Sequence, residues 1–260
     1  MKKNYILFFD SGIGGLTTLK ETIKLFNYNY MYYADNKHSP YGNKTKSEIF
    51  DYISQILTEL RRKYSIKFVV IACNTATASA INELRLNFQD IIFIGTEPAV
   101  NIAKKLNFNN ILSLTTPLTM SLDKYKSLLS LTNGNIFTIG MKNFAKNIEN
   151  YYLSPTTNNK IKLLKDVCFV YKNAKNYDCI VLGCTHFIFA KPFFYQLSNI
   201  PLIDGNVGIA NNLIKYLHDF NIKPTKKYKI KILLSDKNQT LAKKYKKILC
   251  QTLAKWNKLC

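Results

Sequence analysis

The amino-acid sequence predicts an α/β fold built on parallel sheets, with its strands and helices divided between two lobes. Two short apolar runs support this prediction, FVVIAC (68–73) and CIVLGC (179–184), and both end on a cysteine. Continuous apolar runs rich in β-branched residues are typical of strands buried on both faces of a parallel sheet. Strands and helical stretches also alternate along the whole chain, which is the pattern of right-handed βαβ crossovers.

The first lobe is expected to hold four strands joined by helices. Apolar residues at Ile49, Ile53, Ile56, Leu57 and Leu60 recur at helical spacing and predict a crossover helix with one face in the core. The expected strands are 5–9, 30–34, 68–72 and 91–95, and two more helices are expected over about 16–26 and from after Thr75 to about Phe88.

The same pattern then restarts in a second lobe. Its expected strands are 111–114, a short one near Ile136, 179–182 and 202–203, and its expected helices are about 120–131, one that includes Phe144 and Glu149, 161–174 and 207–220. A strand at 228–234 and an amphipathic helix at 240–259 end the chain and are expected to return to the first lobe. The predicted domains are residues 1–96 with 210–260, and residues 97–209.

Composition is that of an ordinary globular protein. Of 260 residues, 47% are hydrophobic and 20% are charged, so the chain can bury a full core. No apolar run approaches the roughly 20 residues that span a bilayer. The apolar stretch near the N-terminus leads into Asp10 and a glycine-rich turn instead of a cleavage site of small residues. We therefore expect a cytoplasmic protein with no membrane contact.

The six cysteines fit a reducing compartment and lack the regular spacing of a disulfide framework. The nearest approach to a metal signature is formed by Cys179, Cys184 and His186. Because Cys179 and Cys184 bracket one strand, they would lie at its opposite ends. We therefore expect no metal site.

The formal net charge of +21 is unusually high. A basic protein attracts phosphate backbones, so a nucleic-acid partner is one interpretation. The lysines are spread widely, however, and the densest basic stretch, KPTKKYKIKILL from Lys223, alternates like a strand with one solvated face. We therefore favour a solvated basic surface and expect no nucleic-acid partner.

The turn DSGIGG, which begins at Asp10, joins the first strand to the first helix. It differs from the dinucleotide fingerprint because Thr17 stands where the last glycine is needed. A strand–glycine–helix turn still offers free backbone N–H groups to an anion, and a carboxylate suits them as well as a phosphate does.

Cys73 and Cys184 each follow a buried strand and precede a helix start, where open α/β sheets bind ligands and where free N–H groups favour a thiolate. Asp10 ends the first strand and His186 lies two residues after Cys184, so each could hydrogen-bond a thiol. Two opposed acid/base groups suit removal of a proton from one face of a stereocentre and its return on the other. The alternative is a single cysteine nucleophile with His186 as its base.

Short polar residues beside these thiols are suited to grip an ammonium group and carboxylates. They are Ser11, Asn74, Thr75 and Thr185. The turn marked by Pro40 and Gly42 places Tyr41 at the same edge of the sheet. The spacing alone favours a structural role, in which the aromatic ring of Tyr41 fills space at the turn.

Five motifs occur in one order over essentially the full chain: DSGIGGLTTL (10–19), YYADNKHSPYG (32–42), ACNTATA (72–78), GTEPAV (95–100) and LGCTHF (182–187). Together they resemble the bacterial glutamate racemases, in the aspartate/glutamate racemase superfamily. Aspartate racemases typically have Glu where this chain has His186, which favours glutamate.

The resemblance implies two pseudo-symmetric α/β domains with the active site in the cleft between them, and a homodimer. It implies cofactor-independent interconversion of L- and D-glutamate by a two-base mechanism, which supplies D-glutamate for peptidoglycan and so for the cell wall and cell shape. Cys73 would act on one face of the substrate with help from Asp10, and Cys184 on the other with help from His186.

By the same match, Glu149 is an acidic residue near the second thiol. The substrate-binding positions implied are Asp10, Ser11, Tyr41, Gly42, Asn74, Thr75, Thr116, Thr185 and His186. Two alternatives stay open: a racemase of aspartate or another amino acid, and a basic, non-catalytic protein that binds DNA or gyrase.

Overall fold

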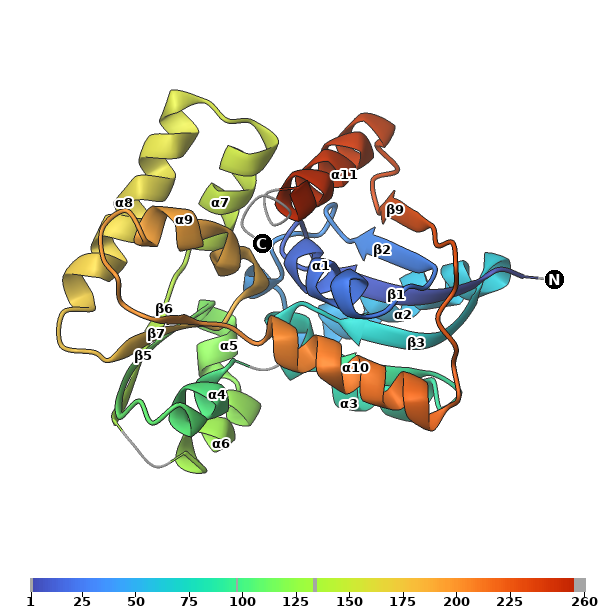
Figure 1. The fold of residues 1–260 in the computed structure, drawn as a ribbon, viewed down its shortest axis with the longest axis horizontal. Coiled ribbons are helices and arrows are strands. Elements are labelled where there is room, and N and C mark those ends of the chain that lie inside the picture. Colours follow the sequence, from blue (N-terminus) through green and yellow to red (C-terminus); the bar gives the residue numbers. More distant parts are fainter. Residues whose placement is uncertain (1, 97, 133–134, 255–260) are drawn as a thin grey trace. The chain divides into compact units, whose positions relative to one another are not determined.

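The computed structural model describes residues 2–96, 98–132 and 135–254, which form two compact units (Figure 1). The first unit contains residues 1–96 and 206–260 and the second contains residues 97–205, within those described ranges. Each unit has one sheet, and every strand pairing in both sheets is parallel among the described residues. The predicted α/β class is confirmed.

The first unit is a five-stranded sheet covered by helices. Its strand order is β4 (Ile92–Gly95), β3 (Ser65–Ile71), β1 (Asn4–Asp10), β2 (Tyr30–Ala34) and β9 (Ile230–Leu234). Helix α1 (Leu16–Leu25) packs against α10 (Asn206–Asp219) and α11 (Gln239–Ala254), whereas α2 (Lys46–Lys63) packs against α3 (Asn74–Asn87). The apolar stripe predicted on α2 is buried, and a capping box of Thr45 and Glu48 begins that helix.

The second unit is a four-stranded sheet in the order β6 (Asn135–Gly140), β5 (Asn110–Thr115), β7 (Cys179–Leu182) and β8 (Leu202–Ile203). Its helices are α4 (Val100–Lys105), α5 (Pro117–Ser121), α6 (Asp123–Ser130), α7 (Phe144–Leu153), α8 (Thr157–Asn173) and α9 (Lys191–Phe194). A 3₁₀ helix, η2 (Thr185–Ala190), connects β7 to α9.

The two sheets share one topology. In each, the first strand lies between the second and the third, and the fourth lies beyond the third; β9 extends only the first sheet. The direction of winding therefore reverses between β1 and β3 in the first unit and between β5 and β7 in the second. Open α/β sheets bind ligands at the carboxyl ends of strands at such a reversal. Cys73 follows β3 and Cys184 follows β7, so the two cysteines occupy equivalent positions.

Some helix bounds differ from the predicted ones. The helix expected over 120–131 is two helices, because the backbone at Leu122 is extended between α5 and α6. This break buries Leu122 and lets the Tyr125 hydroxyl contact Ser113 and Thr138 at 2.9 Å each. The last helix is described to Ala254, and the part predicted at 255–259 lies outside the described residues, as does Glu97 of GTEPAV. No helix among the described residues is long and apolar enough to cross a bilayer.

Candidate active site

In the first unit, Asp10 and Ser11 lie at the carboxyl end of β1, the central strand, and both are buried. The Asp10 carboxylate accepts the backbone N–H of Gly12 at 2.9 Å. The hydroxyl of Tyr32, on the neighbouring strand β2, donates to the carbonyl of Gly12 at 2.6 Å. The turn that follows β1 is therefore held from both sides.

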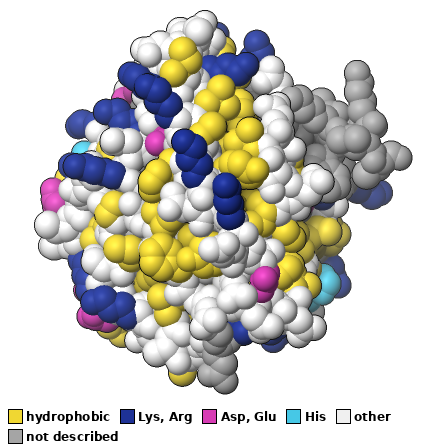
Figure 2. Space-filling view, turned by 90° about the vertical axis from the view of Figure 1, so that its left-hand side faces the viewer, with side chains coloured by type: hydrophobic (Ala, Val, Ile, Leu, Met, Phe, Trp, Pro, Cys, Tyr) yellow, Lys and Arg dark blue, Asp and Glu magenta, His cyan; other side chains and the backbone are white. Residues whose placement is uncertain are grey.

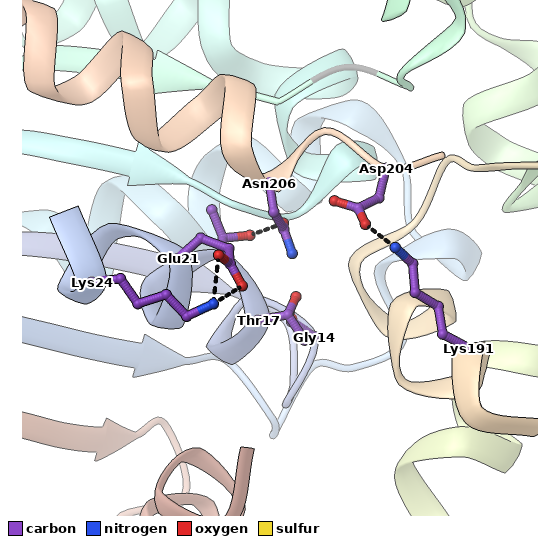
Figure 3. A network of polar contacts seen from close by, with 8 residues as sticks. Gly14, Thr17, Glu21, Lys24, Lys191, Asp204 and Asn206 are labelled. Carbon is purple, nitrogen blue, oxygen red and sulfur yellow. Dashed lines mark hydrogen bonds and ion pairs between the residues drawn. The ribbon is translucent and has the colours of Figure 1, made fainter. Parts of the chain in front are cut away.

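The glycine turn after β1 brings α1 close to the strand ends. A Cβ added at Gly15 would lie 2.8 Å from Cβ of Ala72 and 3.0 Å from Cβ of Asp10, so the approach requires a glycine. Thr17 stands where a dinucleotide motif has its last glycine, and its hydroxyl donates to the carbonyl of Gly14 at 2.9 Å (Figure 3). This turn is built for close packing against β1 and β3.

Cys73 is the N-cap residue of α3. Its sulfur accepts the backbone N–H of Ala76 at 3.4 Å and lies 3.9 Å from the hydroxyl oxygen of Ser11, within hydrogen-bonding range for sulfur. Asn74 and Thr75 form the first turn of α3 and are buried. An N–H donor aimed at the sulfur from a helix N-terminus stabilises negative charge there.

Tyr41 lies in the short 3₁₀ helix η1 (Tyr41–Asn43), which also holds Gly42, and its side chain is buried. Its hydroxyl donates to the fully buried carboxylate of Asp35 at 2.6 Å. Burial, followed by the charge and hydrogen bond of Asp35 and the nearby Cys73 and Asp10, raises the pKa of Tyr41 well above its usual value. Tyr41 therefore remains a neutral donor at physiological pH.

His38 completes this arrangement from the same loop. Its Nδ1 lies 2.9 Å from both carboxylate oxygens of Asp35, and its ring stacks on Tyr52 with centroids 3.9 Å apart. Asp35 therefore connects two side chains of the loop, His38 and Tyr41, to the carboxyl end of β2.

Replacing Tyr41 with phenylalanine is expected to lower the free energy of unfolding by about 1–3 kcal/mol, because a buried carboxylate loses a donor. Urea unfolding followed by circular dichroism would measure the change. Tyr33→Phe is the matched control, since Tyr33 is nearby on β2 and only partly buried. An equal loss in both variants would contradict a specific role for the Tyr41 hydroxyl.

In the second unit, Cys184 follows β7 after a single glycine and precedes η2. The backbone N–H of Gly183 donates to the carbonyl of Leu114, on β5, at 2.7 Å. A Cβ at Gly183 would lie 2.7 Å from that same oxygen and 2.9 Å from Cγ2 of Thr115. The chain can pass this close to β5 only with glycine at position 183.

Gly183→Ala is expected to destabilise the protein by about 1–3 kcal/mol, since the added methyl group would clash with backbone. It should also displace Cys184 and reduce the activity proposed below. Gly140→Ala is the control in the same unit, because its added Cβ would lie 3.2 Å from Cα of Pro117. Thermal unfolding of both variants tests this, and a melting temperature that falls no further for Gly183→Ala than for Gly140→Ala would refute it.

His186 is buried in η2 and faces α7, where its Nε2 lies 2.7 Å from a carboxylate oxygen of Glu149. Burial alone lowers the pKa of His186, but hydrogen bonds to Cys184 and Glu149, together with the charges of both groups, raise it well above its usual value. The imidazole is therefore a hydrogen-bonded link between the second thiol and an acidic side chain.

Two threonines lie at the same end of the second sheet. Thr116 follows β5, the neighbour of β7, and caps α5 by accepting the N–H of Thr119 at 3.2 Å. Thr185 is buried directly after Cys184. Among the described residues, no group of three His, Cys, Asp or Glu side chains is arranged to hold a metal ion.

No family model matches the chain, but curated relatives do. The glutamate racemase of Clostridium botulinum is 37% identical over 257 residues, which cover 95% of this chain and 98% of that protein. Glutamate racemase 2 of Bacillus subtilis is 40% identical over 222 residues, 82% of each chain. This chain belongs to the glutamate racemase family. The crystal structure of Escherichia coli glutamate racemase matches with a TM-score of 0.82 and 24% identity, over 96% of this chain and 95% of that one, which shows a common fold.

In this member of the glutamate racemase family, the predicted site residues form two groups, one in each unit. Around the ends of β1 and β3 lie Asp10, Ser11, Tyr41, Gly42, Cys73, Asn74 and Thr75, and around the ends of β5 and β7 lie Thr116, Glu149, Cys184, Thr185 and His186.

Sequence reasoning assigned no role to Tyr32, Asp35 or His38 of this racemase-family chain. A signal for Asp35 was present, because Asp35 follows its strand as Asp10 follows β1. Nothing in the spacing indicated that Tyr32 and His38 would bond to Gly12 and Asp35.

Proposed function

We propose that this protein interconverts L- and D-glutamate, with Cys73 and Cys184 as the two proton carriers. The main support is that both thiols follow the third strand of sheets with the same topology, and that each has polar groups directed toward it. Membership of a family whose curated relatives are named glutamate racemases supports the choice of substrate.

In the proposed reaction one thiolate removes the α-proton of glutamate, and the other thiol gives its own proton to the opposite face of the carbanion. The electron pair left on the α-carbon by the first step forms the new C–H bond in the second. Each turnover therefore exchanges the protonation states of Cys73 and Cys184. Exchange of the thiol protons with water, or a following reaction in the reverse direction, restores them.

Asp10 would assist Cys73. His186 would assist Cys184, and Glu149 would hydrogen-bond His186. The contact of Glu149 with His186 supports the second of these roles, and the contact of Ser11 with the Cys73 sulfur supports Ser11 as a polar neighbour of the first thiol. The residues expected to bind the ammonium and carboxylate groups of the substrate are Ser11, Tyr41, Gly42, Asn74, Thr75, Thr116 and Thr185, with Asp10 and His186.

The α-proton of an amino acid is very weakly acidic, so the carbanion must be stabilised by the protein. Fixed donors in a site closed to water can do this, because each hydrogen bond is stronger there than in water. We propose that the backbone N–H groups at the start of α3 and η2, together with the short polar side chains beside them, supply these donors without a cofactor.

We also propose that the D-glutamate formed serves peptidoglycan synthesis in the cytoplasm and that the enzyme is a homodimer. The predicted domains, residues 1–96 with 210–260 and residues 97–209, would each supply one thiol.

The test is to incubate the protein with each glutamate enantiomer in heavy water, and to follow optical rotation and deuterium at the α-carbon. Loss of rotation from both enantiomers, with one deuterium gained per inversion, is the expected result. No inversion of glutamate, or faster inversion of aspartate in a substrate panel, would overturn the proposal.

A further inference from the structure

The positive charge is unevenly distributed along the chain. Residues 221–260 contain twelve lysines and one acidic residue, Asp236, and so contribute +11 of the total +21. The other 220 residues contribute +10. More than half of the net charge therefore belongs to the last 40 residues, which a uniform compositional bias does not explain.

Helix α11 has one apolar and one basic face. Tyr245, Ile248 and Leu249 are buried, whereas Lys243, Lys244, Lys246 and Lys247 are exposed on the other side of the helix. The helix contains no acidic residue. Lysines three and four positions apart on a helix repel one another, and this repulsion lowers the stability of the helix. A bound anion would offset the repulsion.

The segment that leads into β9 extends this basic face. Lys226, Lys227 and Lys229 are exposed, and Lys231 extends over the ring of Tyr64, 4.8 Å from its centroid. Strand β9 is at the edge of the first sheet and α11 packs against it, so the segment, the strand and the helix adjoin within the first unit (Figure 1). Lysines on an edge strand also prevent unwanted strand pairing, but that does not account for the lysines of α11.

On one face of the second unit, the lysines are less concentrated than they are near the C-terminus. There, apolar side chains form a broad band, and lysines and arginines are scattered among apolar and uncharged side chains (Figure 2). Helix α8 also has four exposed lysines, Lys160, Lys162, Lys165 and Lys172, but Asp166 lies among them, and Ile161 and Phe169 are exposed beside them.

Because the charge is concentrated in this part of the chain, we propose, contrary to the expectation from the sequence alone, that the exposed lysines of residues 223–247, called here the C-terminal basic surface, bind nucleic acid through its phosphate backbone. A surface rich in exposed ammonium groups complements a polyphosphate and gives little base recognition. An anionic membrane is the less suitable partner, because a helix that binds a bilayer inserts apolar side chains, whereas Tyr245, Ile248 and Leu249 of α11 are buried within the first unit.

The test compares two variants of equal charge change. One replaces Lys243, Lys244, Lys246 and Lys247 of α11 with glutamine, and the control does the same to Lys160, Lys162, Lys165 and Lys172 of α8. Binding of a fluorescent DNA duplex of about 20 base pairs is measured by anisotropy between about 50 and 200 mM salt. Melting temperature and glutamate turnover report that each variant is folded.

We expect wild-type protein to bind DNA with an affinity that falls steeply as salt rises. The α11 variant should bind at least about tenfold more weakly at low salt and with a shallower salt slope, while the α8 variant stays within about twofold of wild type. Three results would overturn the proposal: no binding at low salt, equal weakening in both variants, or tighter binding to anionic lipid vesicles than to DNA. None of them bears on the racemase activity.

Discussion

Cys73→Ala and Cys184→Ala are each expected to lower the rate of glutamate racemisation by about 10³-fold or more, since inversion needs an acid on one face and a base on the other. The variants should differ in a second respect. In each, the remaining thiolate can still remove and return a proton on its own face. Deuterium should therefore enter the α-position of one enantiomer without inversion, and the favoured enantiomer should be opposite in the two variants. Proton NMR in heavy water follows both processes.

The chain contains suitable controls for this experiment. Cys168 and Cys250 are free and exposed, so Cys168→Ala and Cys250→Ala should leave turnover unchanged. Circular dichroism would verify that the Cys73 and Cys184 variants are folded. A folded Cys73→Ala or Cys184→Ala variant that racemises at a rate near that of wild type would exclude the two-thiol mechanism.

Glu149→Gln is expected to lower kcat by about 10²-fold while KM changes little, because in the proposed mechanism Glu149 acts through His186, which it contacts, and not through the substrate. Loss of the carboxylate charge lowers the pKa of His186, and burial lowers it further. The thiolate of Cys184 then loses the positive charge that stabilises it. The primary isotope effect with α-deuterated substrate should rise in the direction in which Cys184 removes the proton, and stay nearly constant in the other direction.

The same pair predicts how stability depends on pH. Folding raises the pKa of His186 above its unfolded value of about 6.5. Protonated His186, in contact with Glu149, therefore contributes its full stabilisation below about pH 6.5, and this contribution is lost as pH rises through the folded-state pKa of His186. As the pH rises from about 6.5 through the folded-state pKa, the melting temperature of wild type should fall by more than the melting temperature of Glu149→Gln. Parallel curves for the two proteins would argue against a raised pKa at His186.

Local pattern was sufficient to locate most of the secondary structure. The strands at Tyr30–Ala34 and Cys179–Leu182 have the bounds that their apolar runs predict, and the stripe on α2 is buried as expected. These elements depend on which residues alternate or recur within a few positions, so a single sequence contains the information. The break at Leu122 was missed because it follows from contacts of Leu122 and Tyr125 with the rest of the second unit.

The sequence by itself determined the α/β class, the two cysteines at equivalent strand ends and, through its five motifs, the glutamate racemase family. Only the tertiary structure determined which side chains hold these groups: Tyr32 on the glycine turn, Asp35 between His38 and Tyr41, Glu149 on His186, and β5 against Gly183. The physical reason is that strand ends follow from local hydrophobic pattern, whereas hydrogen bonds and close approaches in the folded protein depend on which strands and loops pack together.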